Sequence, residues 1–280
     1  MSPAISVCIP TFNGQDTLAE AVRSVLDQTV DLELILCDGG SVDNTVNVIR
    51  SFNDSRVVFV DNRAAQSAEE NWNRAVAASS APFVKVMGQD DILLPDCLAT
   101  ELAVMTQSSS SAVAFCYSKR LLNVAGKHLG KRRELESNST RIVESNQLLQ
   151  SIVRSGRNPV GEPVAVTMRR SCFDAAGGYR GSYVIDLDLY VRMLRYGNAA
   201  RISATLSVFR VSGSSWSYRL RKSQSTEVRI LHKRIKNDTE ARIGRFSYVI
   251  GFISAGLFPV ARVIVMWCSE HLERIVRSQR

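Results

Sequence analysis

Residues 5–40, ISVCIPTFNGQDTLAEAVRSVLDQTVDLELILCDGG, change their hydrophobic period twice, and this change indicates the fold class. Ile5 to Ile9 is an apolar run typical of a buried strand, and Leu32 to Cys37 is a second one. Between them, Asp16 to Gln28 has the period of an amphipathic helix. The apolar face of this helix is formed by Leu18, Val22, Val25 and Leu26. A strand, a helix and a second strand in this order predict parallel pairing through a right-handed crossover.

The same alternation continues to residue 87. Asp43 to Phe52 and Ser67 to Ala78 are predicted helices, and Val57 to Val60 and Phe83 to Met87 are predicted strands. Strands separated by helices indicate an α/β protein with a doubly wound, mostly parallel sheet flanked by helices. Ligands of such sheets bind outside the carboxyl ends of the strands, so the segments that follow the strands are candidates for the functional site.

Length and composition are those of a globular protein. The chain has 280 residues, 45% of them hydrophobic, which is enough for one large α/β core with a C-terminal appendage. Its six cysteines include no CxxC pair, and no secretory leader precedes the first strand, so a reducing, cytoplasmic compartment is favoured. Three histidines lack the spacing of a metal cluster and are expected at the surface: His128, His232 and His271.

Positive charge is concentrated late in the chain. The formal net charge is +8, and between Tyr218 and Arg245 nine Lys and Arg residues accompany three acidic ones. Such a stretch suits an anionic surface, either lipid or nucleic acid.

An uncharged segment, Phe246 to Ala261, follows the basic stretch, and Val263 to Trp267 is also apolar. Pro259 and Arg262 interrupt the run, and a spanning helix needs about 20 predominantly apolar residues, so a membrane span is not expected. Two arrangements stay open: a pair of helices packed on the main domain, or a shallow anchor at an anionic membrane surface. We favour the anchor, which would place the protein peripherally at the inner face of the cell membrane.

Polar and acidic residues follow three of the predicted strands, in the segments PTFNG (10–14), DGGSVDNT (38–45) and GQDD (88–91). Strand ends need turns, and Asp43 could simply cap the next helix. Asp90 and Asp91 are different, because adjacent carboxylates beside an apolar strand repel each other and lose hydration, and therefore require a cation. Oxygen ligands suit Mg²⁺ or Mn²⁺, which retain water and bridge to phosphates. The pair therefore predicts a site for a metal-bound diphosphate.

Four motifs in series resemble the nucleotide-binding half of family 2 glycosyltransferases with the GT-A fold. They are PTFNGQDTLAEAVRSVLDQT (10–29), CDGGSVDNT (37–45), ENWNRAV (70–76) and VMGQDDILLPDCL (86–98). The resemblance extends from Ile5 to Ser217. It implies a GT-A domain over 1–217, with a nucleotide-binding half at about 1–110 and an acceptor half at about 111–217. A helical extension, first basic and then apolar, would occupy 218–280.

The resemblance assigns roles to the residues that follow the strands. The loop that supports the donor nucleotide would contain Pro10, Thr11 and Asn13, although proline and asparagine are also ordinary loop formers. Asp38 would hydrogen-bond the nucleobase. Asp90 would lie near the ribose or the metal, and Asp91 would be the direct metal ligand of a DxD-type motif. The metal would neutralise charge on the departing nucleoside diphosphate.

A second acidic motif is VIDLDLY, residues 184–190. Asp186 and Asp188 are two positions apart, so on a helix they diverge by roughly 200° and cannot share a face. The stretch is similar to the family's Glu-Asp-x-Asp-Leu-Trp motif, with Ile185 in place of the glutamate. This likeness makes Asp186 the candidate general base. Asp188 is a further candidate contact, although stabilisation of the helix start explains it adequately.

The chain departs from the family pattern near its predicted phosphate site. Members commonly carry Tyr-Arg-x-His-x-x-Ser-x-Ser, and here FRVSGSSWS (209–217) places Ser212 where the histidine would be. A hydroxyl is a weaker ligand than imidazole, so we expect Asp91, diphosphate and water to hold the metal, while Arg210 pairs with phosphate. Glu162, which precedes a proline and should have an extended backbone, could reach an acceptor sugar.

These features predict a metal-dependent, inverting glycosyltransferase that uses a nucleotide-diphosphate sugar. The acceptor would be a saccharide or a polyprenyl-linked saccharide, as in bacterial surface polysaccharide assembly, and inversion is implied by the family alone. A noncatalytic nucleotide-sugar-binding or scaffold protein stays open, because the family's glutamate and histidine are missing. A nucleotidyltransferase is disfavoured because no glycine-rich basic loop follows the first strand, and dinucleotide binding because no GxGxxG motif is present. We expect no nucleic acid partner.

Overall fold

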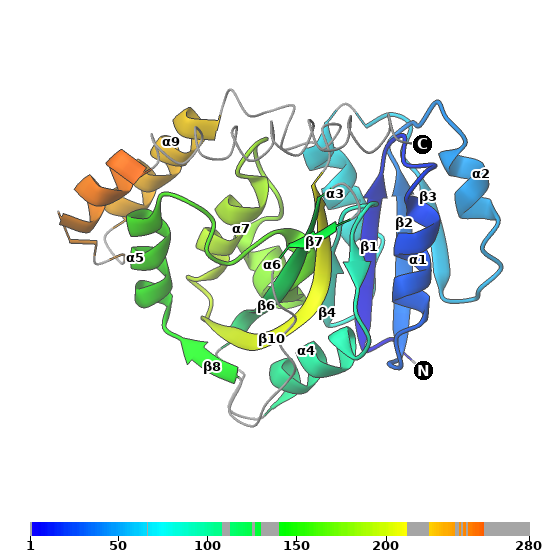
Figure 1. Ribbon diagram of the computed structural model, residues 1–280, viewed down its shortest axis with the longest axis horizontal. Coiled ribbons are helices and arrows are strands. Elements are labelled where there is room, and N and C mark those ends of the chain that lie inside the picture. Colours follow the sequence, from blue (N-terminus) through cyan, green and yellow to red (C-terminus); the bar gives the residue numbers. More distant parts are fainter. Residues whose placement is uncertain are drawn as a thin grey trace.

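The computed structural model describes residues 2–65, 67–107, 113–124, 127–129, 140–211, 224–238, 241, 243–244 and 246–254. Helices flank one mixed sheet with the strand order β3-β2-β1-β4-β9-β6-β10-β5 (Figure 1). Strand β7 extends this order by pairing with β6, and β8 pairs with β10. The predicted α/β class with a mostly parallel sheet is confirmed.

The N-terminal half contains parallel strands joined by helical crossovers, as the sequence predicts. Its strands are β1 (Ile5–Thr11), β2 (Leu32–Asp38), β3 (Val57–Asp61) and β4 (Phe83–Val86). Its helices are α1 (Leu18–Leu26), α2 (Thr45–Arg50) and α3 (Ala68–Ala77). The chain moves from β1 outward to β2 and β3, then returns to place β4 on the other side of β1. The strand order thus reverses at β1 and β4, and doubly wound sheets bind ligands outside the carboxyl ends of the strands at such a reversal.

The second half adds antiparallel pairs to the sheet. Its strands are β5 (Ile92–Leu93), β6 (Val113–Val124), β7 (Lys127–Leu129), β8 (Thr140–Val143), β9 (Val166–Arg169) and β10 (Asn198–Val211). Its helices are α4 (Cys97–Thr106), α5 (Ser145–Ser155), the 3₁₀ turn η2 (Pro163–Ala165), α6 (Arg170–Ala176), α7 (Ile185–Met193) and α9 (Gln224–Asn237). β9 lies between β4 and β6 and is antiparallel to both, whereas β6 and β10 are parallel. β9 begins directly after η2, which Pro163 starts.

Hydrophobic side chains fill both faces of the sheet. Cys8 of β1 packs in the cluster formed with α3, α5, α6 and α7, whereas Val7 and Ile9 pack on the opposite face with α1 and α4. Every residue of β1 is buried, which explains its continuous apolar sequence.

One buried ion pair interrupts this core. Lys85 of β4 and Glu101 of α4 are both 0% exposed, and Lys85 Nζ lies 2.8 Å from Glu101 Oε2. Thr167 donates to the same carboxylate at 2.7 Å, and Ser118 donates to its other oxygen at 3.3 Å. The carboxylate therefore joins α4 to strands of both halves.

The C-terminal part of the described chain is helical. α9 packs against α5 through buried Val228, Leu231 and Ile235, and residues 246–254 form a further helix beside α9 (Figure 1). Among the described residues, no helix combines the length and the apolar character that a membrane span requires.

Candidate active site

Asp38, the last residue of β2, organises the loop that follows it. Its carboxylate is fully buried and accepts hydrogen bonds from the backbone N–H groups of Gly40 at 3.1 Å and Ser41 at 3.0 Å. Thr11, its register partner at the end of β1, donates to it at 3.3 Å. Asp38 is thus committed to its own loop in this structure, and its contact with a nucleobase stays a prediction.

The loops after β1 and β2 are joined to each other by hydrogen bonds. Asn13 N–H donates to Ser41 Oγ at 2.9 Å, and the Asn13 side chain accepts from Val42 N–H at 3.0 Å. Asn13 has a φ of 51°, a left-handed conformation that asparagine tolerates. Pro10 is buried inside β1, so of the three predicted loop residues only Asn13 is exposed. These bonds hold the loop edge in a defined shape before any ligand binds.

Asp90 and Asp91 lie in the turn after β4. Asp91 is 2% exposed, and its carboxylate accepts hydrogen bonds from the backbone N–H groups of Gly88 and Arg210, both at 3.2 Å. A Cβ at Gly88 would lie 2.8 Å from Asp90 Oδ1 and 3.0 Å from Asp91 Oδ2, so the two carboxylates converge over this glycine. Burial raises the pKa of Asp91 well above its ordinary value, and Asp90 raises it further. Burial also raises the pKa of Asp90.

Two converging carboxylates of this kind fit a hard divalent cation. An added positive charge would offset both the burial and the mutual repulsion of Asp90 and Asp91. The described residues contain no group of three or more His, Cys, Asp and Glu side chains that could hold a metal ion. A partial protein shell completed by phosphate and water is the arrangement that Mg²⁺ and Mn²⁺ sites with phosphate substrates use. Ser212 lies outside the described residues.

Arg210, at the end of β10, contacts this acidic pair through its backbone. Its guanidinium forms an ion pair with Glu20 of α1, and its charge lowers the pKa of Asp90 after burial has raised it. The side chain thus lies within electrostatic range of the acidic pair, and its contact with phosphate stays a prediction.

Asp186 lies in the first turn of α7 and is half-buried. Its Oδ2 accepts from Asn158 Nδ2 at 3.0 Å, and its Oδ1 accepts from Leu187 N–H at 2.7 Å. Asn158 also donates to the Gly161 carbonyl at 2.8 Å, so it joins Asp186 to the segment that carries Glu162. Sequence analysis missed Asn158, and no motif marks it.

Asp188 contacts different residues from Asp186, as expected for two positions that are two apart on a helix. It is 6% exposed, accepts from Arg192 Nε at 2.8 Å and pairs with Arg234 of α9. Arg192 also donates to the carbonyls of Ala176 and Gly178. Asp188 therefore joins α7 to α9, and an acceptor contact has no support from this geometry.

Glu162 has the extended backbone expected before a proline, with φ −69° and ψ 160°. Its carboxylate pairs with Arg120 of β6, another residue that sequence analysis missed. Gly161 has a φ of 115°, and a Cβ there would lie 2.8 Å from Arg120 Nη1, so a glycine is needed for this close approach. The charge of Glu162 contributes to the raised pKa of Asp91, after burial and Asp90. Glu162 is therefore within electrostatic range of Asp91, and its segment is joined to Asp186 through Asn158.

Two buried tyrosines line the Asp186 side. Tyr179 and Tyr190 are 1% and 0% exposed, and neither hydroxyl has a hydrogen-bond partner among the described residues. Burial raises the pKa of the Tyr190 hydroxyl well above its ordinary value, and Asp186 and then Glu162 raise it further. Tyr190 is therefore within electrostatic range of both Asp186 and Glu162.

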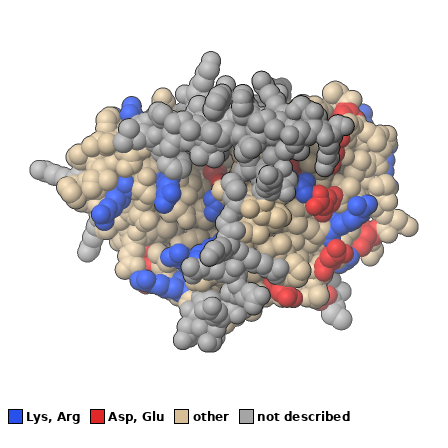
Figure 2. All heavy atoms as spheres, viewed as in Figure 1, with Lys and Arg blue, Asp and Glu red and all other residues tan. Residues whose placement is uncertain are grey.

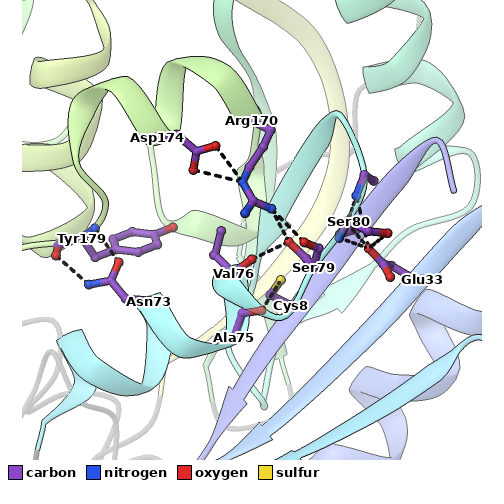
Figure 3. Close-up of polar contacts among 12 residues, drawn as sticks. Cys8, Glu33, Asn73, Ala75, Val76, Ser79, Ser80, Arg170, Asp174 and Tyr179 are labelled. Atoms are coloured by element: carbon purple, nitrogen blue, oxygen red, sulfur yellow. Dashed lines mark hydrogen bonds and ion pairs between the residues drawn. The ribbon is translucent and has the colours of Figure 1, made fainter. Parts of the chain in front are cut away.

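Polar contacts behind the sheet join the two halves (Figure 3). Asn73 of α3 donates to the Tyr179 carbonyl at 2.9 Å and accepts from its N–H at 2.8 Å. Arg170 at the start of α6 donates to Ser79 Oγ at 2.8 Å and pairs with Asp174. The segment that leads to Asp186 is therefore held against the N-terminal half.

The prediction that all histidines lie at the surface is wrong for His232. This side chain is 2% exposed on the buried face of α9, and its neighbour Leu231 is part of the hydrophobic core. Burial lowers its pKa to about 4. His128 is exposed, as predicted, and His271 lies outside the described residues.

Comparison with known proteins agrees with this geometry. The Escherichia coli protein named UDP-Glc:alpha-D-GlcNAc-diphosphoundecaprenol beta-1,3-glucosyltransferase WfgD is 32% identical over 38% of this chain and 43% of its own length. Staphylococcus aureus TarS 1-349 in complex with UDP-GlcNAc superposes with a TM-score of 0.65 at 16% identity, over 91% of this chain and 72% of TarS 1-349. Pyrobaculum calidifontis mannosyltransferase PcManGT, in complex with GDP-Man and Mn²⁺, superposes with a TM-score of 0.64 at 14% identity, over 100% of this chain and 83% of PcManGT.

The two solved structures establish the likeness of fold alone, and the chain spans less than half the length of WfgD. The family model described as "Glycosyl transferase family 2" matches residues 6–176, which is more than half of the chain. The protein therefore belongs to glycosyl transferase family 2 and has the GT-A fold.

Proposed function

We propose that this glycosyltransferase moves a sugar from a nucleoside-diphosphate donor to a hydroxyl of a lipid-linked saccharide in bacterial surface polysaccharide assembly. The observation that carries the proposal is the convergence of the Asp90 and Asp91 carboxylates over Gly88, with Asp186 joined through Asn158 to the segment that carries Glu162. A donor diphosphate and an acceptor hydroxyl would thus meet between two sets of carboxylates. The name of WfgD, which acts on a diphosphoundecaprenol-linked sugar, supports the acceptor class.

On the donor side, Asp91 would hold Mg²⁺ or Mn²⁺ together with Asp90. The loop after β1, which contains Asn13, would support the nucleotide, and Asp38 would hydrogen-bond the nucleobase. A bound cation would neutralise the negative charge on the leaving diphosphate. Arg210 would move from Glu20 to a phosphate oxygen, since a guanidinium pairs with either anion. The PcManGT complex with GDP-Man and Mn²⁺ supports a cation requirement in this fold.

On the acceptor side, Asp186 would act as the general base. It would take the hydroxyl proton while the acceptor oxygen attacks the anomeric carbon and the bond from that carbon to the diphosphate oxygen breaks. The product would have inverted configuration, because the attack and the departure occur on opposite faces. Asn158 and the Leu187 N–H group would orient the carboxylate through their hydrogen bonds. Glu162 would contact the acceptor sugar, either after its ion pair with Arg120 breaks or while it keeps that pair.

The expected location is the inner face of the cell membrane, with the protein bound peripherally. The five described cysteines are all free, which supports a reducing compartment. A lipid-linked acceptor would require the site to operate at a membrane surface.

A noncatalytic nucleotide-sugar-binding protein is the second candidate. This candidate is favoured because two residues of the family's motifs are replaced in this chain. Ile185 occupies the position of the glutamate, and Ser212 occupies that of the histidine. Both candidates would bind the nucleotide-sugar, but only the enzyme would turn it over.

The test is donor turnover by the full chain, with UDP- and GDP-sugars and with Mg²⁺, Mn²⁺ or a chelator. We expect metal-dependent turnover that Asp186→Asn reduces by about a hundredfold or more while nucleotide binding is retained. Asp174→Asn is the matched control, because Asp174 is an exposed, ion-paired carboxylate on α6. Undiminished turnover by Asp186→Asn would contradict the assignment of the base. Absence of turnover with every donor, despite nucleotide binding, would favour the noncatalytic candidate.

A further inference from the structure

The helix formed by residues 246–254 presents its large apolar side chains to solvent. Phe246 is 77% exposed, Val249 55%, Phe252 49% and Ile253 57%. Residues 246, 249 and 253 are spaced three and four apart, so they share one helix face. Exposed apolar side chains that are grouped in this way mark an interaction surface, whereas single ones need no explanation.

The opposite face of the same helix lies against the protein. A Cβ at Gly251 would lie within bonding distance of the Val153 carbonyl of α5, so the helix backbone contacts α5 directly. Gly251 lies on the face opposite to residues 246, 249 and 253, at 100° per residue. The small residue therefore faces inward and the large apolar ones outward, the reverse of an ordinary surface helix.

Cationic side chains of α9 border these apolar groups. Arg229 lies over the ring of Phe252 with 4.5 Å from Cζ to the ring centroid, and Lys236 lies over the ring of Tyr248 at 4.2 Å. These two pairs place α9 and the 246–254 helix side by side. Exposed Ile230 and Lys233 lie on α9 as well. We define the hairpin face as the surface made of Arg229, Ile230, Lys233, Phe246, Val249, Phe252 and Ile253.

Charge is distributed unevenly over the molecule. On the face drawn in Figure 2, Lys and Arg are the prominent charged side chains at the end formed by α5 and α9, whereas most Asp and Glu side chains lie toward the other end, near β1 to β3. The hairpin face contains two cations and no acidic residue. Its partner should therefore combine an apolar interior with a negative surface.

We propose that the hairpin face binds the surface of an anionic lipid bilayer, with Phe246, Val249, Phe252 and Ile253 inserted at the level of the headgroups. Apolar side chains bordered by Lys and Arg are what interfacial helices use. The proposal deepens the proposed function, because a lipid-linked acceptor lies at such a surface, but it stands on the hairpin face alone.

The test is co-sedimentation of the full chain with vesicles of phosphatidylcholine alone, or of equal parts phosphatidylcholine and phosphatidylglycerol. We expect binding to the anionic vesicles that weakens at high salt. The double variant Phe246→Ser with Ile253→Ser should weaken binding by about tenfold or more. Arg229→Gln and Lys233→Gln should each weaken it by about fivefold.

A matched double variant, Val58→Ser with Ile142→Ser, removes two apolar side chains that are exposed on β3 and β8, and it should bind as the unaltered chain does. Absence of vesicle binding would overturn the proposal, as would undiminished binding by the Phe246→Ser, Ile253→Ser variant. Loss of a dimer by that variant while vesicle binding persists would also overturn it, since the hairpin face would then contact a second copy. Donor turnover without vesicles is measured in parallel. Failed turnover with intact vesicle binding would refute the proposed function and leave the hairpin face as a membrane site.

Discussion

The proposed donor side of the site, formed by the loops after β1 and β2, and the proposed acceptor side around Asp186 are held in different ways. On the donor side, neighbouring loops bond to one another: Asp38 accepts from Gly40 and Ser41, and Asn13 joins the loop after β1 to the loop after β2. On the acceptor side, the segment before Asp186 is held by a residue far along the chain. Glu227 of α9 accepts from Ser182 Oγ at 2.9 Å and from Tyr183 N–H at 2.8 Å. Local turn chemistry thus shapes the donor side, and tertiary packing of α9 shapes the acceptor side.

This difference predicts that changes to α9 affect the acceptor side and that changes to the β1 and β2 loops affect the donor side. The buried ion pair of Lys85 and Glu101 is shared by both sides, because it joins β4 to α4, and the Glu101 carboxylate also accepts from β6 and β9.

The largest effect is expected for Lys85→Met. This change leaves Glu101 buried without its cation, and breaking a buried pair in this way costs about 3–5 kcal/mol of the free energy of unfolding. Urea denaturation of the full chain measures the loss. Lys85→Met with Glu101→Leu should recover most of it, because a well-packed apolar pair replaces the charges. A loss below about 1 kcal/mol for the single variant would mean that the ion pair does not hold the two halves together.

The next effect concerns pH and His232. The ordinary histidine pKa is 6.5, and burial lowers that of His232 to about 4. Between these values the unfolded chain binds a proton that the folded chain does not, so the free energy of unfolding falls as the pH falls from 6.5 toward 4. The contribution of this one residue at pH 5 is a loss of about 2 kcal/mol.

Urea denaturation at pH 7.5 and pH 5 should therefore show a smaller loss for His232→Leu than for the unaltered chain. His128→Leu is the matched control, because His128 is exposed. Equal losses for all three proteins would show that His232 is hydrated or paired in solution. This measurement also tests the difference between the donor and acceptor sides, because it reports how α9 packs and the acceptor side depends on α9.

A smaller effect is expected for Glu227→Gln. The amide keeps the shape of the side chain but loses the charge-assisted bonds to the segment 182–184, worth about 1 kcal/mol, so kcat should fall roughly fivefold. The KM for the donor should not change, since the hydrogen bonds of Glu227 within the described part of the chain go to residues 182–184. Steady-state kinetics at saturating acceptor measure both quantities. An increase in the donor KM with unchanged kcat would contradict the division between the two sides.

The sequence predicts the donor side better than the acceptor side for the same physical reason. Alternating periods predict the parallel strands, because each strand and helix buries its own apolar face. The turn residues Asp38 and Asn13 are recognisable because asparagine, aspartate and glycine have strong local preferences. Asn158 and Arg120 carry no such local signal, and their partners lie 28 and 42 residues away, at Asp186 and Glu162.

Lys85 lies in the strand that the sequence predicts, but the sequence does not identify its buried partner Glu101, and the prediction that His232 lies at the surface is wrong. A single sequence does not show which buried polar group finds a partner in space, since that depends on the packing of helices such as α4 and α9 onto the sheet.

The smallest effect is expected for Asn13→Gly, on the donor side. Glycine adopts the left-handed conformation at φ 51° without strain, so this change removes only the hydrogen bond from Val42 N–H, an exposed contact worth about 0.5 kcal/mol. The donor KM should rise roughly twofold with unchanged kcat, the opposite pattern to Glu227→Gln. Asn13→Ala loses the same bond and also pays the left-handed penalty of roughly 1 kcal/mol, so its KM should rise further. If glycine and alanine raised KM equally, the backbone conformation of the loop would be unimportant for the donor. The donor side would then depend on side-chain contacts, as the acceptor side does.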